Sequence, residues 1–521
     1  GAGRGERQGG GGFIVEAQAA RQPEREPEHD EEVDEQRQRD AEDVERQLLP
    51  TAQTYATALR QQQSDMRRRL ATMESALAAF PAAGRTVRQV SRQVREDLAT
   101  RLAEHGANIE RITRLTETHL GSVEIHITLP PGKEPDAKPI MLMAHQDVVP
   151  IAEGTESRWS VDPFAGTVRD GFIWGRGAWD NKSNLMSIME AIEALAAQGF
   201  QPRQTIYVVA GHDEESGGVG GARKVAELLA SRGVRLDFVM DEGTLITEGV
   251  IKGLDKPVAL IGVAEKGIMT VSLHAHDEPG HASMPPRETA IGMLSEALAR
   301  LERNPMPATV GGVAAQMFDT LAPEMKFPNR VLLSNLWLFS PLVKRELEKS
   351  RGSNAFMRTT AALTVVRAGN KVNVVPAQAE AFVNYRMLPG DTQADVLRHI
   401  REVMRNAQIK LGQTGAASEA SPVSATDSAS YRLMSTTIRE VFPGTVVAPG
   451  LMVAATDSRH MQSIADQVYR FSPVRVREED LTRFHGTDER ISVSNHAEMI
   501  AFYHRLITAA SQSAQATSEG R

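Results

Sequence analysis

Short apolar runs alternate with stretches of helical spacing through the middle of the chain. Residues 139–144 and 205–210 are almost wholly apolar, which is typical of central strands buried on both faces of a sheet. Residues 184–197 and 221–231 are predicted to form helices, and residues 238–240 a further short strand. Because strands alternate with helices, the pattern predicts an α/β fold with helices on the faces of the sheet.

Two shorter signals lie around this core. Val123, Ile125 and Ile127 alternate with polar residues, which predicts a half-buried strand. Residues 167–169 and 172–174 flank Asp170 and Gly171, and this dipeptide between two short strands is a strong hairpin signal.

Near residue 265 the pattern changes and favours an inserted α+β domain. Its predicted strands are 269–274, 361–366 and 379–386, and its predicted helices are 290–303 and 392–405. Helices and strands alternate again from 430 to 510, so this segment is expected to complete the first domain. The expected division is a first domain made of 49–264 and 419–510, with 265–418 inserted.

The two ends of the chain have a different composition. Residues 1–48 are rich in Gly, Glu, Asp, Arg and Gln and have almost nothing to bury, which predicts a disordered charged tail. Residues 511–521 are expected to form a second tail. Apolar residues at helical spacing predict amphipathic helices within 55–77 and 87–102. We favour packing of these helices on their own domain over a coiled-coil partner face.

Composition narrows the class of protein. Hydrophobic residues make up 41% of the 521 residues, which is enough for a sizeable core. The net charge of −8 gives no global attraction to nucleic acid or to an anionic membrane. The longest apolar runs, such as 258–264, are too short to span a bilayer. The sequence contains no cysteine, which excludes disulfides, thiolate zinc sites, iron–sulfur clusters and cysteine nucleophiles.

The sequence does not fix the cellular compartment of the protein. The chain begins with Gly1 and shows no apolar signal region, which suggests a processed or trimmed form. We expect a soluble protein, secreted or periplasmic if an N-terminal signal has been removed.

Polar clusters that suit chemistry follow the predicted strands. His145 and Asp147 end the strand at 139–144, and residues two apart on a strand project from the same face. Ligands usually bind at that carboxyl edge of an α/β sheet. The other clusters are Asp180 in a glycine-rich loop, Glu214–Glu215 after 205–210, Asp241–Glu242 after 238–240, and His485 in the returning segment.

Taken singly, each cluster has an ordinary interpretation as a helix cap, a turn or a solvated charge. Taken together, they bring histidines and carboxylates to strand ends of one sheet without any cysteine. Such ligands suit zinc, manganese or cobalt. Five ligands with one bridging carboxylate would fill two metal sites, each with an open position for water or substrate.

These residues resemble a known family, the dizinc metallopeptidases that include carboxypeptidase S, aminoacylase-1 and glutamate carboxypeptidase. The branch most resembled contains carboxypeptidase S and the N-fatty-acyl-amino-acid hydrolase/synthases. The matching stretches follow the family's motif order from about residue 120 to 507: 141–150, 175–182, 211–216, 238–243, 265–267, 280–285, 373–376, 386–390, 456–459 and 485–486. Residues 1–115 lack the usual family opening, and Asn181 stands where many relatives have a second aspartate.

The resemblance implies a zinc-peptidase-type catalytic domain with a mixed sheet and flanking helices, and an inserted lid or dimerisation domain. It implies two zinc ions, for which cobalt or manganese could substitute. Asp180 would bridge them. One ion would also bind His145 and Asp241, and the other Glu215 and His485. Glu242 is the alternative to Asp241, since relatives differ over which of the two neighbouring acids is the ligand.

The resemblance also implies catalytic and binding roles. Asp147 would hold the His145 ring in its ligating tautomer, and Glu214 would be the general base. His281 would reach the site from the inserted domain, within one chain or across a homodimer, and stabilise the oxyanion. Arg386 would bind the substrate carboxylate. The alternative for His281 is a histidine that only forms part of a turn, and the alternative for Arg386 is a structural ion pair.

The expected function is zinc-dependent hydrolysis of an amide bond next to a free carboxylate, in an N-acyl amino acid or a short peptide. Synthesis of N-acyl amino acids would use the same site in reverse. A non-catalytic metal-binding scaffold of the same fold is the alternative. A nucleotide-binding enzyme is disfavoured, because the glycines of 217–220 have imperfect spacing and acids stand beside them. Apolar residues within 305–360 could line a pocket for an acyl chain or form a dimer face. The default interpretation is that they belong to an ordinary hydrophobic core.

Overall fold

The computed structural model describes residues 127–128 and 137–512. The helices predicted within 55–77 and 87–102 and the tail predicted at 1–48 lie outside the described residues. Of the strand predicted near 123–127, only the end is described, as β1 (Ile127–Thr128). At the other end, helix α12 (Val493–Gln512) continues two residues into the segment that we expected to be a tail.

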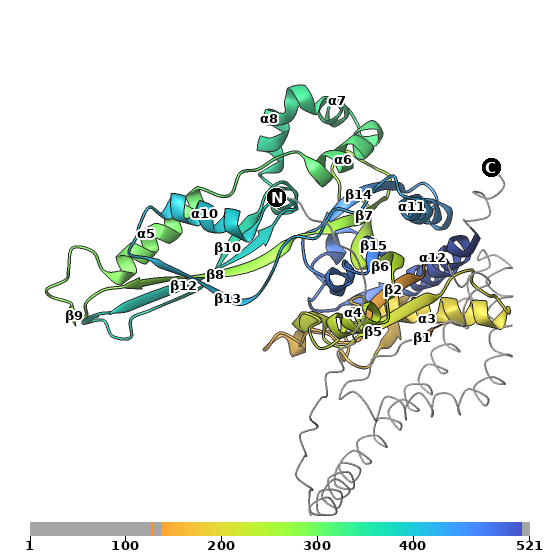
Figure 1. The fold of residues 1–521 in the computed structure, drawn as a ribbon, viewed down its shortest axis with the longest axis horizontal. Coiled ribbons are helices and arrows are strands. Elements are labelled where there is room, and N and C mark those ends of the chain that lie inside the picture. Colours follow the sequence, from red (N-terminus) through yellow and green to blue (C-terminus); the bar gives the residue numbers. More distant parts are fainter. Residues whose placement is uncertain (1–126, 129–136, 513–521) are drawn as a thin grey trace, which may run out of the picture. The chain divides into compact units, whose positions relative to one another are not determined.

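A mixed seven-stranded sheet forms the centre of the fold (Figure 1). The strands β2, β5 and β6 run parallel to one another, and β15 runs parallel to β6. The C-terminal segment therefore joins a sheet begun more than 200 residues earlier. In sheet order the strands are β1, β5 (Ile206–Gly211), β2 (Ile140–His145), β6 (Leu236–Thr247), β15 (Ala465–Val476), β7 (Val258–Glu265) and β14 (Val446–Met452).

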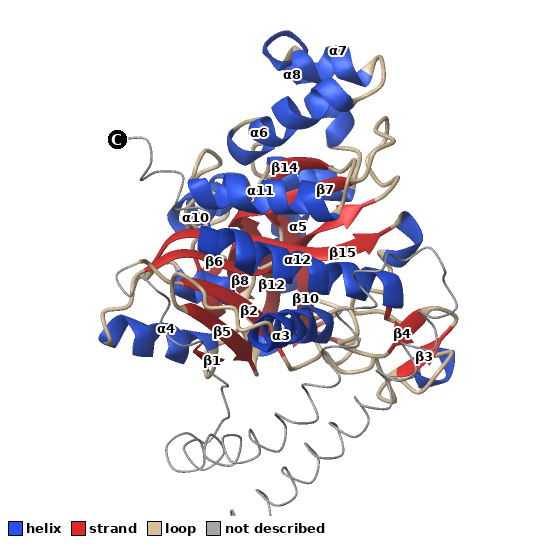
Figure 2. Ribbon diagram, turned by 90° about the vertical axis from the view of Figure 1, so that its right-hand side faces the viewer, coloured by secondary structure: helices blue, strands red, loops and turns tan. Residues whose placement is uncertain are grey.

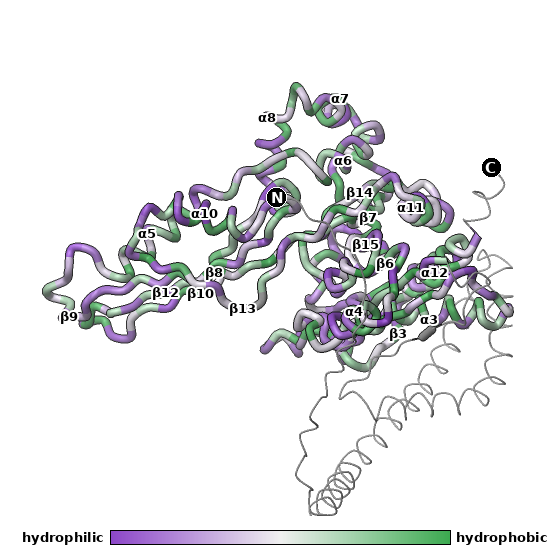
Figure 3. The backbone as a smooth tube through the Cα atoms, in the orientation of Figure 1, coloured by the Kyte–Doolittle hydropathy of each residue, from purple (hydrophilic) through white to green (hydrophobic). Residues whose placement is uncertain are grey.

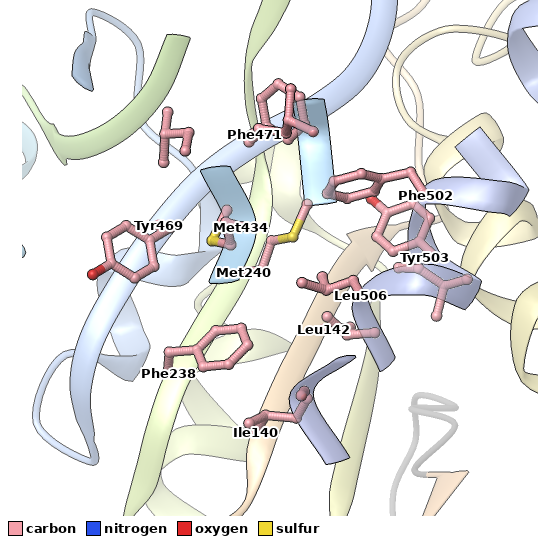
Figure 4. Close-up of a cluster of buried hydrophobic side chains, with 14 of the residues drawn as sticks. Ile140, Leu142, Phe238, Met240, Met434, Tyr469, Phe471, Phe502, Tyr503 and Leu506 are labelled. Atoms are coloured by element: carbon pink, nitrogen blue, oxygen red, sulfur yellow. The ribbon is translucent and has the colours of Figure 1, made fainter. Parts of the chain in front are cut away.

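Helices cover this sheet on both faces, which explains the continuous apolar runs of its strands. Ile140 and Leu142 of β2 join a core cluster with residues of α3 (Lys182–Ala197), α11 (Ala429–Val441) and α12 (Figures 2 and 4). Met141 and Met143, which alternate with them, join a second cluster with residues of α4 (Ala222–Ser231). The predicted α/β class is confirmed.

A small three-stranded sheet lies beside the loops that carry the polar clusters. The hairpin predicted at Asp170 and Gly171 is confirmed: it joins β3 (Thr167–Arg169) to β4 (Phe172–Trp174). Both turn residues have positive φ angles, 55° and 78°, as a two-residue hairpin turn of this kind requires. Strand β16 (Arg490–Ser492) pairs with β4, so the chain just after His485 is held next to the glycine-rich loop before Asp180.

A four-stranded antiparallel sheet is built entirely from residues within the predicted insertion. Hydrophobic and polar residues alternate along its strands (Figure 3), and α5 (Ala290–Arg303) and α10 (Gln393–Met404) pack on its apolar face (Figure 1). The strand order is β10 (Thr360–Ala368), β12 (Gln378–Met387), β8 (Gly267–His276) and β13 (Lys410–Ser418).

Four helices lie between α5 and β10: α6 (Gly312–Leu321), α7 (Asn329–Ser334), α8 (Leu336–Leu347) and α9 (Arg351–Met357). Met317 and Phe318 are buried in a cluster with residues of β7 and β14, as the default interpretation of these apolar residues expects. Phe327 and Trp337 are instead more than 80% exposed. Within the described part of the chain, no helix has the length and apolarity needed to cross a membrane.

Candidate metal centre

The first cluster lies where β2 ends. His145 is 2% exposed, and its Nδ1 lies 3.1 Å from the Asp147 carbonyl oxygen and 3.3 Å from the Asp147 carboxylate. That carboxylate also accepts hydrogen bonds from the backbone N–H groups of Glu214 and Glu215, at 3.2 and 3.0 Å. Asp147 therefore ties the end of β2 to the turn that follows β5, and it orients the His145 ring.

Asp180 lies between two histidines that are 340 residues apart in sequence. One of its carboxylate oxygens is 3.0 Å from Nε2 of His145, and the other is 2.7 Å from Nε2 of His485. The side chain is 5% exposed. Each oxygen faces a different imidazole, which is the arrangement that a bridging carboxylate needs.

Glutamates flank this pair of histidines. An oxygen of Glu242 lies 3.2 Å from Nε2 of His145, and an oxygen of Glu215 lies 3.5 Å from Nε2 of His485. Potential ligand atoms lie within 4.8 Å of one another in two groups, one formed by His145, Glu214 and Glu242 and the other by His145, Asp180 and Glu215.

Asp241 is buried on β6 but points to other partners. Its carboxylate accepts hydrogen bonds from the backbone N–H of Ser458 at 2.8 Å and of Glu242 at 2.9 Å. Like His485, it belongs to neither ligand group found among the described residues, but of the two adjacent acids it is Glu242 whose oxygen lies 3.2 Å from Nε2 of His145. The geometry therefore favours Glu242, the alternative in the sequence analysis, as the acid that faces His145. The sequence shows two acids after a strand but not which of them faces the site.

Crowding of carboxylates shifts the acid–base properties of the site. Burial, with the nearby charge of Glu242, raises the pKa of Glu214 to about 9. Burial, with the charge of Asp180, raises the pKa of Glu242 to about 8. The hydrogen bond to Asp180, with the carboxylate of Glu215 nearby, raises the pKa of His485 to about 10. Anionic carboxylates are thus disfavoured unless a positive charge lies among them.

The donor set fits divalent cations. Imidazole nitrogens and carboxylate oxygens are the ligands that zinc takes in sites without cysteine. One oxygen of Glu215 is buried and has no hydrogen-bond partner among the described residues, although it lies near His485. An acceptor of this kind, beside a carboxylate shared by two histidines, is what a metal-binding site provides.

Asn181 occupies the position at which many resembled proteins have aspartate. Its side chain is buried, and its Oδ1 accepts a hydrogen bond from Asn184 at 2.6 Å in the first turn of α3. Its role is therefore in the helix start that follows Asp180.

The glycines after Glu215 make room for another acid, Asp457. A Cβ atom on Gly218, whose φ is +64°, would lie 1.9 Å from an oxygen of that buried carboxylate. Burial, with the charge of Asp241, raises the pKa of Asp457 to about 8. A pyrophosphate would meet this acid, which argues further against nucleotide binding. The sequence analysis did not single out Asp457, whose only signal was its place in the 456–459 motif.

Arg386 lies at the end of β12 where β8 and β10 begin, paired with Ile268 and Thr360. Its Nε donates a hydrogen bond to Asn384 at 3.2 Å, and no salt bridge to an acid forms among the described residues. Burial, with the charge of Arg459, lowers the pKa of Arg386. A half-buried guanidinium without an acidic partner is suited to an anionic ligand.

His281 lies beyond the opposite end of β8, outside the four-stranded sheet. It is exposed on β9 (Gly280–His281), which pairs with β11 (Val374–Val375), and its Nδ1 is 2.8 Å from the Ser283 hydroxyl. Strand β8 alone spans about 30 Å from Gly267 to His276, and His281 follows five residues later. The structure of the single chain thus does not bring His281 to the His145 group.

The comparisons with known proteins place this chain in a family. Peptidase family M20/M25/M40 matches residues 141–509, and the chain belongs to it. It is accordingly a hydrolase of the M20 peptidase family, as the motif resemblance predicted.

Two relatives show the branch. The chain is 42% identical over 426 residues to the N-fatty-acyl-amino acid synthase/hydrolase PM20D1 of Xenopus tropicalis, covering 80% of this chain and 82% of that protein. It is 40% identical over 378 residues to a carboxypeptidase S-like protein of Dictyostelium discoideum, covering 72% of each. Among solved structures, an M20 family metallo-carboxypeptidase of Sulfolobus solfataricus matches with a TM-score of 0.54 at 17% identity, over 75% of this chain and 88% of that one, and supports the fold.

Proposed function

We propose that this chain is a dizinc amidohydrolase that cleaves the amide bond of N-acyl amino acids, with the reverse synthesis at the same site. The observation that carries the proposal is the Asp180 carboxylate, whose two oxygens face His145 and His485. The names of the relatives, an N-fatty-acyl-amino acid synthase/hydrolase and a carboxypeptidase S-like protein, support a substrate with a free carboxylate.

The described side chains would hold two metal ions around Asp180. His145 and Glu242 would complete one site, and Glu215 and His485 the other, which replaces Asp241 of the sequence analysis with its neighbour. When bound, two divalent ions supply a water of lowered proton affinity and polarise the amide carbonyl. Cobalt or manganese would satisfy the same ligands.

Glu214 would act as the general base. It lies beside His145 and Glu242, and Asp147 holds its backbone N–H. It would take a proton from the attacking water and later give that proton to the leaving nitrogen. Synthesis reverses these proton transfers through the same carboxyl group. Asp147 accepts from Nδ1 of His145, which leaves Nε2 free to bind a metal.

Arg386 would bind the substrate carboxylate, since its guanidinium is half-buried at the end of β12 and has no acidic partner among the described residues. His281 would stabilise the oxyanion from a second copy of the chain. The length of β8 supports this arrangement, because it places His281 far from the beginning of its own inserted sheet.

Metal content and substrate range together test the proposal. We expect purified protein supplied with zinc to bind two ions per chain and to hydrolyse N-acyl amino acids, and to lose activity on chelation. The panel should contain long-chain N-acyl amino acids, their carboxamide analogues and dipeptides. Two bound zinc ions without turnover of any member would favour the non-catalytic scaffold. Absence of bound zinc would refute the metal centre itself.

A further inference from the structure

A buried ion pair joins the two loops that carry Asp180 and His485. Nη1 of Arg176 lies 2.5 Å from Oε2 of Glu489, and the two side chains are 2% and 0% exposed. The residues are 313 positions apart in sequence. Arg176 precedes Asp180 in the glycine-rich loop, and Glu489 follows His485 just before β16.

Glu489 uses its second oxygen to hold the Asp180 loop. That oxygen accepts hydrogen bonds from the backbone N–H groups of Trp179 at 2.9 Å and of Asp180 at 3.1 Å. The backbone carbonyl of Glu489 also accepts from Gly175 N–H at 2.9 Å. Glu489 thus fixes the peptide group from which the bridging carboxylate projects.

Arg176 uses its second terminal nitrogen to hold the His485 loop. Nη2 donates to the carbonyl oxygens of His485 at 3.0 Å and of Gly486 at 3.1 Å. His485 has a φ of +57°, in the left-handed region, and its side chain is 42% exposed. Because the ring contacts Asp180 on one side and is otherwise open to solvent, the hydrogen bonds from Arg176 to this backbone help to fix the position of the ring.

Stability alone is a weak explanation for such a pair, because the desolvation of two buried charges offsets much of their attraction. A second buried pair in the chain, Arg470 with Glu265, provides a comparison. Its side chains are 0% and 4% exposed, and Glu265 likewise accepts from a backbone N–H, that of Thr456. Of these two pairs, only Arg176–Glu489 makes hydrogen bonds to the backbone of two proposed metal ligands, Asp180 and His485.

We propose that Arg176 and Glu489 are positioning residues that fix the distance between the bridging Asp180 and the ligand His485, and thereby set the affinity of the metal site shared by Asp180, His485 and Glu215. This inference rests on the proposed dizinc function. The other site shares Asp180 but takes His145 from β2 and Glu242 from β6, and among the described residues no hydrogen bond or ion pair joins either of these two to Arg176 or Glu489. Loss of the pair should therefore weaken one metal ion much more than the other.

Two substitutions test separately the contribution of Glu489, which holds the Asp180 loop, and that of Arg176, which holds the His485 loop. Glu489→Gln keeps the shape and an acceptor for the Asp180 loop, but it turns an amide toward Arg176 and removes the ion pair. Arg176→Lys keeps the charge and removes the planar fork that reaches both Glu489 and the His485 loop. Glu265→Gln breaks the comparison pair and serves as the matched control for a buried ion pair elsewhere.

The readouts are zinc stoichiometry by mass spectrometry, stepwise zinc affinity by competition with a chelator, and thermal unfolding of the metal-free proteins. We expect the wild type to bind two ions, and Glu489→Gln and Arg176→Lys to bind one of them about 10–100-fold more weakly. Glu265→Gln should lower the unfolding midpoint and keep both zinc affinities.

Unchanged stepwise affinities in both Arg176→Lys and Glu489→Gln would overturn the inference, as would an equal loss of zinc affinity in Glu265→Gln. If one of these two variants does not fold, the stepwise zinc affinities of the other still test the inference. A wild-type protein that binds no zinc would contradict the proposed function instead, so the two failures are distinguishable.

Discussion

Glu214 and Glu215 are adjacent in sequence but face different partners. Glu215 lies 3.5 Å from Nε2 of His485, whereas Glu214 lies in the group with His145 and Glu242. Both backbone N–H groups are held by the same carboxylate, that of Asp147. This shared anchor allows two identical side chains to take different roles, one as ligand and one as base.

Glu214→Gln should therefore separate metal binding from turnover. We expect two zinc ions to remain bound and kcat for an N-acyl amino acid to fall about 10²–10⁴-fold, because the amide cannot accept the proton of the attacking water. Steady-state kinetics and mass spectrometry on the same preparation measure both quantities. Wild-type kcat in this variant would show that Glu214 is not the base, and loss of zinc would show that it is a ligand.

Asp241 and Glu242 form a second adjacent pair with different surroundings. Glu242→Gln should weaken zinc binding about 10-fold or more, since it removes the charge that faces His145. Asp241→Asn should chiefly lower the free energy of unfolding, by about 1–3 kcal/mol, because Ser458 and Glu242 donate to different oxygens of Asp241 and an amide keeps only one of them. Chelator competition and denaturant unfolding distinguish the two. The opposite pattern would restore Asp241 as the ligand.

Strand register explains why Arg386 and His281 have different environments although both lie within the predicted insertion. Arg386 pairs with Ile268, one residue from the beginning of β8, while His281 follows the other end of that strand. The first domain continues into β8 through Glu265 and Lys266. The Arg386 end of the sheet is thus joined directly to the first domain, and the end nearer His281 lies a strand's length away.

Arg386→Ala should raise KM for carboxylate substrates about 10–100-fold, the value of hydrogen bonds to a charged group. KM for the corresponding carboxamide substrate, which has no negative charge to pair, serves as the control and should change little. Equal KM values for wild type and variant on the carboxylate substrate would assign Arg386 a structural role.

Helix α12 contributes a partly buried histidine that takes no part in the proposed metal centre. Nδ1 of His496 lies 3.2 Å from the Ser187 hydroxyl on α3, and burial lowers the pKa of His496 to about 4. The unfolded chain, with an ordinary histidine pKa near 6.5, binds the proton more readily than the folded one. Folding stability from this group is thus present above about pH 6.5 and is lost as the pH falls toward 4.

His496→Gln should flatten this dependence. Between pH 7 and pH 4 the wild type should lose up to about 3 kcal/mol more stability than the variant, a ceiling because the side chain is only partly buried in the structure. Urea unfolding of the metal-free proteins at several pH values measures the difference, with the exposed His276→Gln as control. Parallel curves for wild type and His496→Gln would contradict the shift.

At the scale of the whole molecule, the fold and the approximate site could be predicted because local signals are strong. Apolar runs marked β2 and β5, and polar residues at their ends marked the site. The Arg176–Glu489 pair could not be predicted, because nothing local links residues 313 positions apart. Likewise, the sequence gives no sign that Asp241 faces Ser458 while Glu242 faces His145, because the choice depends on the neighbouring strand and turn.

The remaining question at this scale is how His281 reaches a site. The length of β8 places it away from its own chain's metal centre, so we propose that it acts in a homodimer, where each copy supplies His281 to the other. His281→Ala and Glu214→Gln should each be nearly inactive as homodimers. In a mixed dimer, the His281→Ala subunit keeps Glu214 and receives His281 from the Glu214→Gln subunit.

Co-expression with two different affinity tags yields that mixed dimer. We expect about half of the wild-type activity per dimer, because one of two symmetry-related sites is complete. If His281 acted within its own chain, each subunit of the mixed dimer would lack one essential group and no activity would return. A monomer by light scattering at assay concentration, with full activity, would contradict the arrangement independently. The complementation therefore tests the oligomeric state and the role of His281 through one measured rate.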